Sequence, residues 1–291
     1  MERPVEVAET EIINYMKKIT CAIVLLLCAC GLRAQELDMK WDRAHMDGSR
    51  TGVTVPNADN VDKALGTVKD GVYYAPNGRV FKTGATPEVA RILIAAQPEM
   101  AFVKEYIGYS PKEVIRSTRP QNELSNLIVD RLMAKTEELT GRKVDAGICN
   151  FGGIRVDLPQ GDVILDDILS MLPFENYLCY VQLKGKDLRA LYEQFARTGM
   201  QVVGGVELTV RDHELVDVKV GGQPLDDDAL YGLATIDFLL DGGDEVHCAK
   251  NALNLVITDT LLRDAVLPYM RELGAAGKPI EYHVDNRVVE L

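Results

Sequence analysis

Residues 149–178 read CNFGGIRVDLPQGDVILDDILSMLPFENYL. A run typical of a buried strand ends near Cys149, and an amide, two adjacent glycines and an arginine then fall between Asn150 and Arg155. Glycines without side chains let a backbone approach a ligand closely. Near the end of the stretch, Phe174 follows a proline. A hydrophobic core does not need this arrangement, so the stretch is predicted to line a binding site.

The sequence on both sides alternates between helical and strand periodicities. Helices are predicted over 123–141 and 185–199, each closed by a glycine, and a third follows a strand within 254–273, with its cap near Asp259. Further strands are predicted over 175–185 and 229–240. A hairpin is predicted over 205–225, because apolar residues alternate on both sides of its turn: Val206, Leu208 and Val210 before it, and Val216, Val218 and Val220 after it. This mixture predicts an α+β domain with a mixed β-sheet flanked by helices, spanning 101–291.

Residues 35–100 are rich in Gly, Asn, Asp and Pro and show little periodicity. One helix is predicted there, with Thr86 as its N-cap and an apolar stripe of Val89, Ile92 and Leu93. We interpret this region as an irregular N-terminal extension packed on the main domain.

Residues 16–35, MKKITCAIVLLLCACGLRAQ, have the pattern of an export signal: a basic start, a short apolar run and small residues after it. Met16 is therefore interpreted as the true start, and 1–34 as upstream residues and signal peptide. Two cleavage sites compete. One resembles a lipobox and would leave Cys30 lipidated, and the other precedes Gln35. Both place the protein in the periplasm or cell envelope, the first as a lipoprotein.

Composition excludes several classes of protein. The formal net charge of -12 argues against a nucleic-acid surface, which needs clustered Lys and Arg. Beyond the export segment only Cys149, Cys179 and Cys248 remain, and they show neither a disulfide framework nor zinc-ligand spacing. We expect them to be buried thiols.

Several polar and aromatic residues could form a nucleotide site, although each also has an ordinary structural role. Asn150 offers the donor and acceptor that a purine edge requires, and Arg155 offers a fork suited to phosphate. Phe174 and Phe238 lie where elements give way to loops and could stack on a base, or they could be core residues. Asp244 could accept two ribose hydroxyls or cap a turn.

These residues lie in motifs that resemble a known family. NFGGIR, GDVILDDILSMLPFEN, VQLKGKDLRALYE, GGVELTV, YGLATIDFLLDGGDE and the closing NRVVEL occur in the order and spacing of the C-terminal, substrate-binding domain of the 5'-nucleotidase / UDP-sugar hydrolase family. The similarity covers about 106–291. It implies the fold of that domain and a nucleoside 5'-phosphate or nucleoside as ligand.

The resemblance also implies roles for individual residues. Phe174 and Phe238 would sandwich the base, Asn150 would bond it, and Asp244 would hold the ribose. The pair Gly152 and Gly153 belongs to the same motif, Arg155 would hold phosphate, and Arg119, with Arg116 as an alternative, would be a second phosphate arginine. The sequence departs from the family in Phe151 and Glu245, which puts the width of the pocket in question.

The family's full-length members carry a dimetal phosphoesterase domain, and the sequence lacks its motifs. His45, His213, His247 and His283 are scattered, without D-x-H, N-H-E or G-H-x-H patterns. We therefore predict no catalytic residue, metal or cofactor in this chain and interpret it as the recognition domain of a split 5'-nucleotidase acting in nucleotide catabolism, with a separate metallophosphoesterase chain. Alternatives are a stand-alone nucleotide-binding protein of the envelope, and the same fold with another ligand and its pocket closed by the extension.

Overall fold

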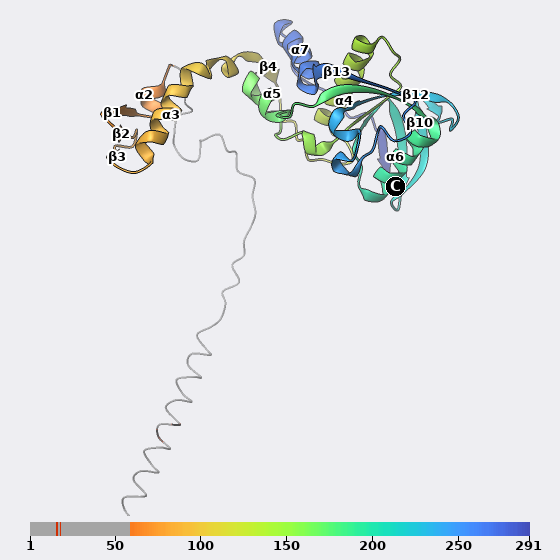
Figure 1. Ribbon diagram of the computed structural model, residues 1–291, viewed down its shortest axis with the longest axis horizontal. Coiled ribbons are helices and arrows are strands. Elements are labelled where there is room, and N and C mark those ends of the chain that lie inside the picture. Colours follow the sequence, from red (N-terminus) through yellow and green to blue (C-terminus); the bar gives the residue numbers. More distant parts are fainter. Residues whose placement is uncertain (1–15, 17, 19–58) are drawn as a thin grey trace, which may run out of the picture. The chain divides into compact units, whose positions relative to one another are not determined.

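The computed structural model describes residues 59–291, together with Met16 and Lys18 (Figure 1). The predicted signal segment and Cys30 otherwise lie outside the described residues, and so do 35–58. Within the described part, no helix combines the length and apolar character needed to cross a membrane.

Residues 59–100 hold more regular structure than predicted. They contain α2 (Val61–Ala64), β1 (Thr67–Lys69), β2 (Val72–Tyr74), β3 (Val80–Phe81) and α3 (Thr86–Glu99). The strands form an antiparallel sheet in the order β1-β2-β3. Strands of two or three residues are too short to show a two-residue period, so the sequence pattern missed them.

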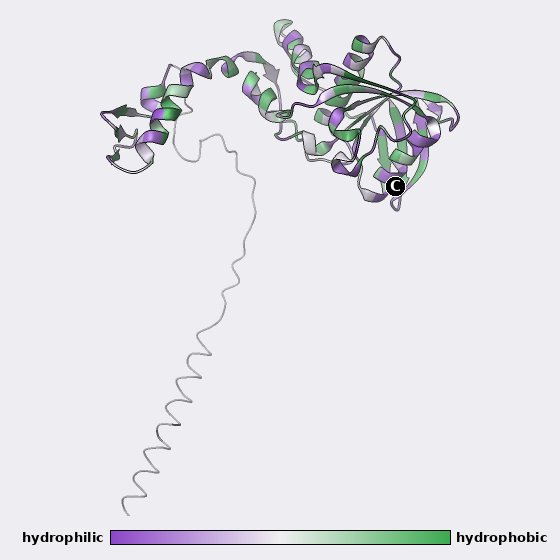
Figure 2. Cartoon of the chain, in the orientation of Figure 1, coloured by the Kyte–Doolittle hydropathy of each residue, from purple (hydrophilic) through white to green (hydrophobic). Residues whose placement is uncertain are grey.

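The helix α3 departs from prediction in two ways. Thr86 is its first helical residue rather than its N-cap, which is Ala85. The residues of its apolar stripe, Val89, Ile92 and Leu93, are 51%, 53% and 49% exposed. Figure 2 shows apolar and polar residues alternating along this helix. Amphipathic spacing therefore predicted the helix correctly but not the burial of its apolar face.

The main domain is built on a five-stranded sheet in the order β13-β7-β12-β5-β8. These strands are β5 (Ala146–Cys149), β7 (Tyr177–Lys184), β8 (Val202–Gly204), β12 (Leu230–Ile236) and β13 (Asn254–Leu261). β12 pairs with β5 in parallel, and every other pair in this sheet is antiparallel. The predicted mixed sheet is confirmed.

A four-stranded sheet, ordered β11-β10-β9-β14, forms a second layer. It consists of β9 (Val206–Arg211), β10 (Glu214–Val220), β11 (Gln223–Pro224) and β14 (Val288–Glu290). The predicted hairpin is β9 and β10, but the register shifts between Leu215 and Asp217, and Val216 is 54% exposed. At this irregularity Val216 is exposed, whereas Val218 and Val220, which alternate with it in the sequence, are buried. A further pair is β4 (Tyr106–Ser110) with β6 (Gly161–Ile164).

Helices cover both faces of the five-stranded sheet (Figure 1). The helices on this sheet are α4 (Glu123–Thr140), α6 (Gly185–Thr198) and α7 (Leu262–Ala275), whereas α5 (Leu165–Met171) packs on β6 and α7. α4 packs on β5, β7, β8 and β12, whereas α6 contacts β7, β12 and β10 and so lies between the two sheets. α7 begins after Leu261 without a side-chain cap, and Asp259 lies within β13, so the cap predicted near Asp259 is wrong.

Candidate functional site

Three chain segments meet at one edge of the five-stranded sheet. The parallel strands β5 and β12 both end there, at Cys149 and Ile236. The antiparallel strand β7 begins there, because Leu178 pairs with Ile236. The loops after β5 and β12 and the loop before β7 are therefore neighbours in space, although they are distant in sequence. This is the edge at which α/β proteins commonly bind ligands.

A pocket of about 210 Å³ lies at this edge. Its lining residues come from all three loops and are Asn150, Gly152, Arg155, Phe174, Asn176, Phe238 and Asp244. Six of the eight residues predicted from the sequence are among them. Gly153 is buried and Arg119 is exposed, and neither lines the pocket.

The two phenylalanines of the pocket are unlike core residues. Phe174 is 46% exposed and Phe238 is 45% exposed, whereas Phe195 inside the domain is 1% exposed. Asp237 ties their loops together, since one of its carboxylate oxygens accepts bonds from the backbone N–H of Phe238 (2.8 Å) and of Tyr177 (3.1 Å). The fold thus holds two apolar ring surfaces at the pocket in contact with solvent, where a flat ligand could cover them.

Asn176 is a pocket residue that the sequence analysis did not identify. It is partly buried and immediately precedes β7. Its position two residues after Phe174, at the start of a strand, was a signal that could have found it. An amide at this place adds a donor and an acceptor to the pocket.

Cationic side chains lie beside the rings. The Arg155 guanidinium carbon is 5.8 Å from the Phe174 ring centre, and its Nη1 donates to the Gly152 carbonyl at 3.2 Å. Within residues 59–291, no carboxylate forms an ion pair with Arg155. Its charge is therefore available to an anionic ligand.

Arg119 belongs to a neighbouring loop and stacks on Phe151, with its guanidinium carbon 3.5 Å from the ring centre. Partial burial, and then repulsion from Arg116, lower the pKa of Arg119. Asn122 caps α4 and also holds this loop in place. Its Nδ2 donates to the carbonyls of Arg116 and Thr118, both at 3.0 Å. Arg116 is itself paired with Asp157 at 4.0 Å and donates to the Ile154 carbonyl.

Phe151 does not restrict the pocket. Its side chain is 4% exposed, lies under Arg119 and is not part of the lining. Together with Glu245, this residue departs from the family motif, and the departure raises the question of how wide the pocket is. The structure shows that the aromatic ring occupies the domain interior and supports the arginine.

A hydrogen bond links two walls of the pocket. Asn150 Nδ2 donates to Asp244 Oδ2 at 2.7 Å, and Asn150 Oδ1 is buried without a hydrogen-bond partner.

The three cysteines Cys149, Cys179 and Cys248 are free and buried, as predicted, and burial raises the pKa of each thiol to about 12. Thiols with such pKa values are protonated and unreactive at neutral pH.

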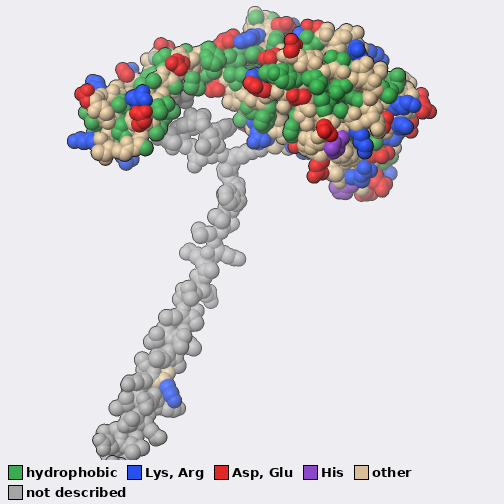
Figure 3. Space-filling model, viewed as in Figure 1, with side chains coloured by type: hydrophobic (Ala, Val, Ile, Leu, Met, Phe, Trp, Pro, Cys, Tyr) green, Lys and Arg blue, Asp and Glu red, His purple; other side chains and the backbone are tan. Residues whose placement is uncertain are grey.

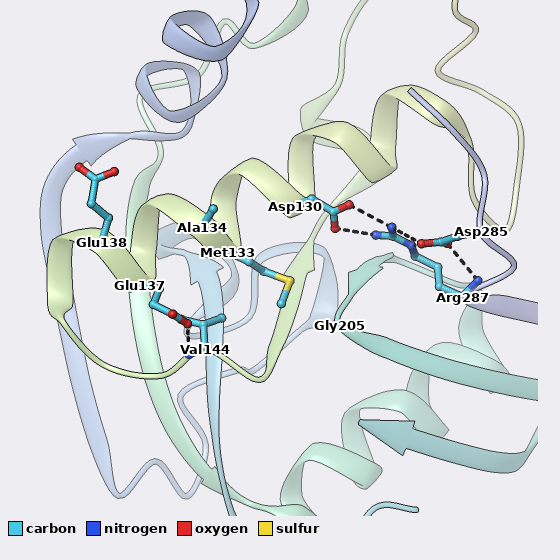
Figure 4. Close-up of a pocket in the computed structure, with 9 residues that line it drawn as sticks. All are labelled: Asp130, Met133, Ala134, Glu137, Glu138, Val144, Gly205, Asp285 and Arg287. Carbon is cyan, nitrogen blue, oxygen red and sulfur yellow. Dashed lines mark hydrogen bonds and ion pairs between the residues drawn. The ribbon is translucent and has the colours of Figure 1, made fainter. Parts of the chain in front are cut away.

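A larger cavity of about 680 Å³ lies elsewhere, between α4 and the C-terminal segment (Figure 4). Its one cation, Arg287, is 6% exposed and is paired with Asp130 (2.9 Å) and Asp285 (2.7 Å). Glu137 and Glu138 add negative charge to the lining. An anionic ligand would be repelled there, so charge favours the smaller pocket.

The described residues do not fit a dimetal centre. Among them, no group of three or more His, Cys, Asp or Glu is placed to hold a metal ion. On the face shown in Figure 3, Lys and Arg are interspersed with Asp and Glu. We derive no metal-dependent step from these residues.

Fold and pocket together define an α+β domain in which two aromatic rings and an arginine without an ion pair among the described residues line a pocket at the ends of β5 and β12. The chain belongs to the 5'-nucleotidase family, because the family model "5'-nucleotidase, C-terminal domain" matches residues 103–251, about half of its length. The resemblance seen in the sequence motifs is thereby confirmed.

Curated relatives and solved structures are consistent with this family assignment. The chain is 29% identical over 72% of its length to the trifunctional nucleotide phosphoesterase protein YfkN of Bacillus subtilis, and 26% identical over 48% to protein UshA of Escherichia coli. It superposes on a 5'-nucleotidase precursor from Thermus thermophilus with a TM-score of 0.62 and 25% identity, over 75% of this chain. The NAD nucleotidase of Haemophilus influenzae shares the fold, with a TM-score of 0.54 and 18% identity over 75%. The chain spans 15% and 26% of the two relatives' lengths, and 45% and 47% of the two structures.

Proposed function

We propose that this chain is the nucleotide-recognition domain of an exported, split 5'-nucleotidase. It binds nucleoside 5'-phosphates for hydrolysis by a metallophosphoesterase on a separate chain, and that partner holds the divalent metals. The observation that carries this proposal is the pocket that combines two half-exposed phenylalanines with an unpaired arginine. The nucleotide-directed names of the relatives support the ligand class.

Each part of a nucleotide has a chemically suited partner at the pocket. The rings of Phe174 and Phe238 present apolar surfaces that a base can cover, and base–aromatic stacking contributes roughly 1–3 kcal/mol per base. Asp244 is exposed and suited to ribose hydroxyls, and Arg155 is suited to phosphate. The volume of about 210 Å³ is below the roughly 300–1,000 Å³ of pockets that enclose drug-sized ligands. The pocket therefore holds part of the nucleotide and leaves the phosphate accessible.

The localisation rests on the sequence of residues 16–35, which has the pattern of an export signal. The protein acts in the periplasm or cell envelope, and lipidation of Cys30 would anchor it to a membrane. Signal cleavage before Gln35 would release it instead. Mass spectrometry of the N-terminal peptide of protein recovered from its native host distinguishes the two.

A second candidate function is a stand-alone nucleotide-binding protein of the envelope. The observation that favours it is that all seven lining residues belong to one domain, so binding needs no second chain. Tight binding by the isolated chain, unchanged when the metallophosphoesterase is added, would support this candidate. Nucleotide hydrolysis that requires both chains would support the split enzyme.

The proposed contact between Arg155 and the phosphate group is tested with the variant Arg155→Ala. Calorimetric titration with AMP and adenosine should show AMP binding about 10- to 100-fold more weakly and adenosine nearly unchanged, since a charge-assisted hydrogen bond contributes about 1.5–3 kcal/mol. The matched control is Arg211→Ala, an exposed arginine outside the pocket. Equal losses for AMP and adenosine would show that Arg155 shapes the loop and does not contact phosphate.

A further inference from the structure

The helix α3 has an apolar side that faces water. Its inner side contacts β1 and β2, and Ala90 is buried there. Val89, Ile92 and Leu93 are each about half exposed, and Met100, two helical turns after Leu93, is 47% exposed. These four exposed residues together form the α3 face. A contiguous apolar surface of this kind marks an interaction site.

The α3 face is not the side that an amphipathic helix normally turns to solvent. That side is formed by Glu88, Arg91 and Glu99, which are all exposed. Arg91 donates to both carboxylate oxygens of Glu88, at 3.0 and 2.6 Å. The helix therefore has a buried side, a charged side and a third, apolar side that no packing within the small sheet requires.

A groove of about 310 Å³ adjoins the α3 face. Its lining includes Leu65, Tyr73 and the α3-face residues Val89 and Leu93, and no charged side chain is part of it. The Tyr73 hydroxyl donates to the Leu65 carbonyl at 2.8 Å, so this polar atom is already engaged. The groove thus suits an apolar side chain of a partner protein and offers nothing to a phosphate.

Contacts through α5 connect the segment that carries α3 to the pocket. A short 3-10 helix, η2 (Ala101–Lys104), follows α3 and packs on α5. At the start of α5, the Leu165 N–H donates to the Glu105 carbonyl at 2.9 Å. At its end, the Met171 carbonyl accepts from the Arg155 N–H, also at 2.9 Å. A protein bound at the α3 face is therefore linked by packed elements to the loop that carries Arg155.

The comparisons indicate what covers the α3 face. Residues 103–291 are 189 of the 291 residues, about 65% of the chain, whereas the Thermus thermophilus structure matches 75% of it. The match therefore includes residues before 103. More than half of that solved chain lies outside the match, and the matched domain is by its description the C-terminal one. The remainder thus precedes the domain, on the side of the sequence where α3 lies.

We propose that the α3 face and its groove are the docking site of the metallophosphoesterase chain. The identity of this partner rests on the proposed function. In a chain that carries both domains the backbone keeps them together, whereas two separate chains need a surface that holds them. The α3 face provides that surface, because removing apolar area from water is favourable. The partner brings apolar side chains and no charge opposite Val89 and Leu93.

The test measures binding between the two chains. The probe is each metallophosphoesterase of the same genome that lacks a domain of this family, purified and loaded with Mn²⁺. By calorimetry, the full-length variants Ile92→Glu and Leu93→Glu should bind it at least about tenfold more weakly than the parent, since a buried, unpaired charge is unfavourable. The matched control, Ala95→Glu, places the same charge on the charged side of α3 and should bind like the parent. AMP affinity should be equal in all four proteins, because none of these residues lines the pocket.

Two other occupants of the α3 face are tested with the chain alone. If Leu93→Glu lowers the melting temperature of the isolated chain, residues of the same chain cover the face and the proposal is wrong. If the parent sediments as a dimer and Leu93→Glu as a monomer, a second copy covers it, which also overturns the proposal. We expect both proteins to be monomers with equal melting temperatures.

Hydrolysis of AMP separates this proposal from the proposed function. If phosphate release requires both chains but Leu93→Glu leaves binding and release unchanged, the split enzyme is supported and the docking site is wrong. If the chains bind through the α3 face but release no phosphate, the docking site is supported and the proposed function is contradicted. If no metallophosphoesterase binds the parent, both are overturned.

Discussion

At the scale of single residues, similar amino acids serve different purposes according to their exposure. Phe195 packs inside the domain, Phe151 supports Arg119 from below, and Phe174 and Phe238 present half their surface to solvent. Nothing in the phenylalanine side chain distinguishes these roles. Packing between segments that are distant in the sequence decides them.

Stacking and core packing respond differently to the same substitution. Phe174→Ala and Phe238→Ala should each weaken nucleoside binding by roughly 1–3 kcal/mol, with little change in melting temperature. The control Phe195→Ala should cost about 3–5 kcal/mol of stability, because it empties a buried site. Calorimetric titration and thermal melts of the three variants provide both quantities. If the two pocket variants melt far below the parent and still bind normally, the base-stacking role is wrong.

At the scale of elements, the C-terminal segment is held to α4 by charged groups. Arg287 bonds both Asp130 and Asp285 and also donates to the Val203 carbonyl at 3.2 Å. Tyr282 donates to Asp130 at 2.6 Å. These contacts precede β14, which pairs with β9, and so help to complete the four-stranded sheet.

This cluster predicts a pH dependence of stability. The hydrogen bond from Arg287 lowers the pKa of Asp285 below its ordinary value. A depressed carboxyl pKa contributes stability above the unfolded value of about 3.9, and that stability is lost as the pH falls through the folded value. Asp285→Asn should therefore melt lower than the parent at pH 7, and the gap should narrow as the pH falls from about 5 to below 3. Melting curves that stay parallel over this range would contradict the prediction.

At the scale of the whole molecule, the described residues 59–291 contain a pocket at the ends of β5 and β12 but no group of residues placed to hold a metal ion. Its relatives are longer, and it covers less than half of the two solved structures. The proposed function assigns recognition to this chain and hydrolysis to a separate one. The domain would then have to present the phosphate of its ligand at an open surface.

This division predicts how the purified chain behaves as a catalyst. With Mn²⁺, Co²⁺, Zn²⁺ or Mg²⁺ it should hydrolyse neither AMP nor UDP-glucose above background, because a metal-bound hydroxide requires clustered ligands. A phosphate-release assay, with and without a chelator, measures this. Metal-dependent turnover that disappears on chelation would show that the chain carries its own catalytic centre.

The sequence by itself determined the family, the α+β class and most of the pocket. Ordered motifs identify a fold because strands, helices and turns depend on local periodicity and on glycine, proline and caps. α4 and α6, the strand β7 and the β9–β10 hairpin all lie where the pattern predicted them. Residues such as Phe174 and Asp244 could be found because they occur within those motifs.

Tertiary structure alone decided which faces are buried and which side chains are already engaged. The exposure of Val89 and Val216 and the position of Phe151 under Arg119 depend on packing between distant segments, which local periodicity does not contain. The bond between Asn150 and Asp244 joins residues 94 positions apart. It exists because two strand ends meet at one end of the sheet, which the spacing of these residues in the sequence does not show.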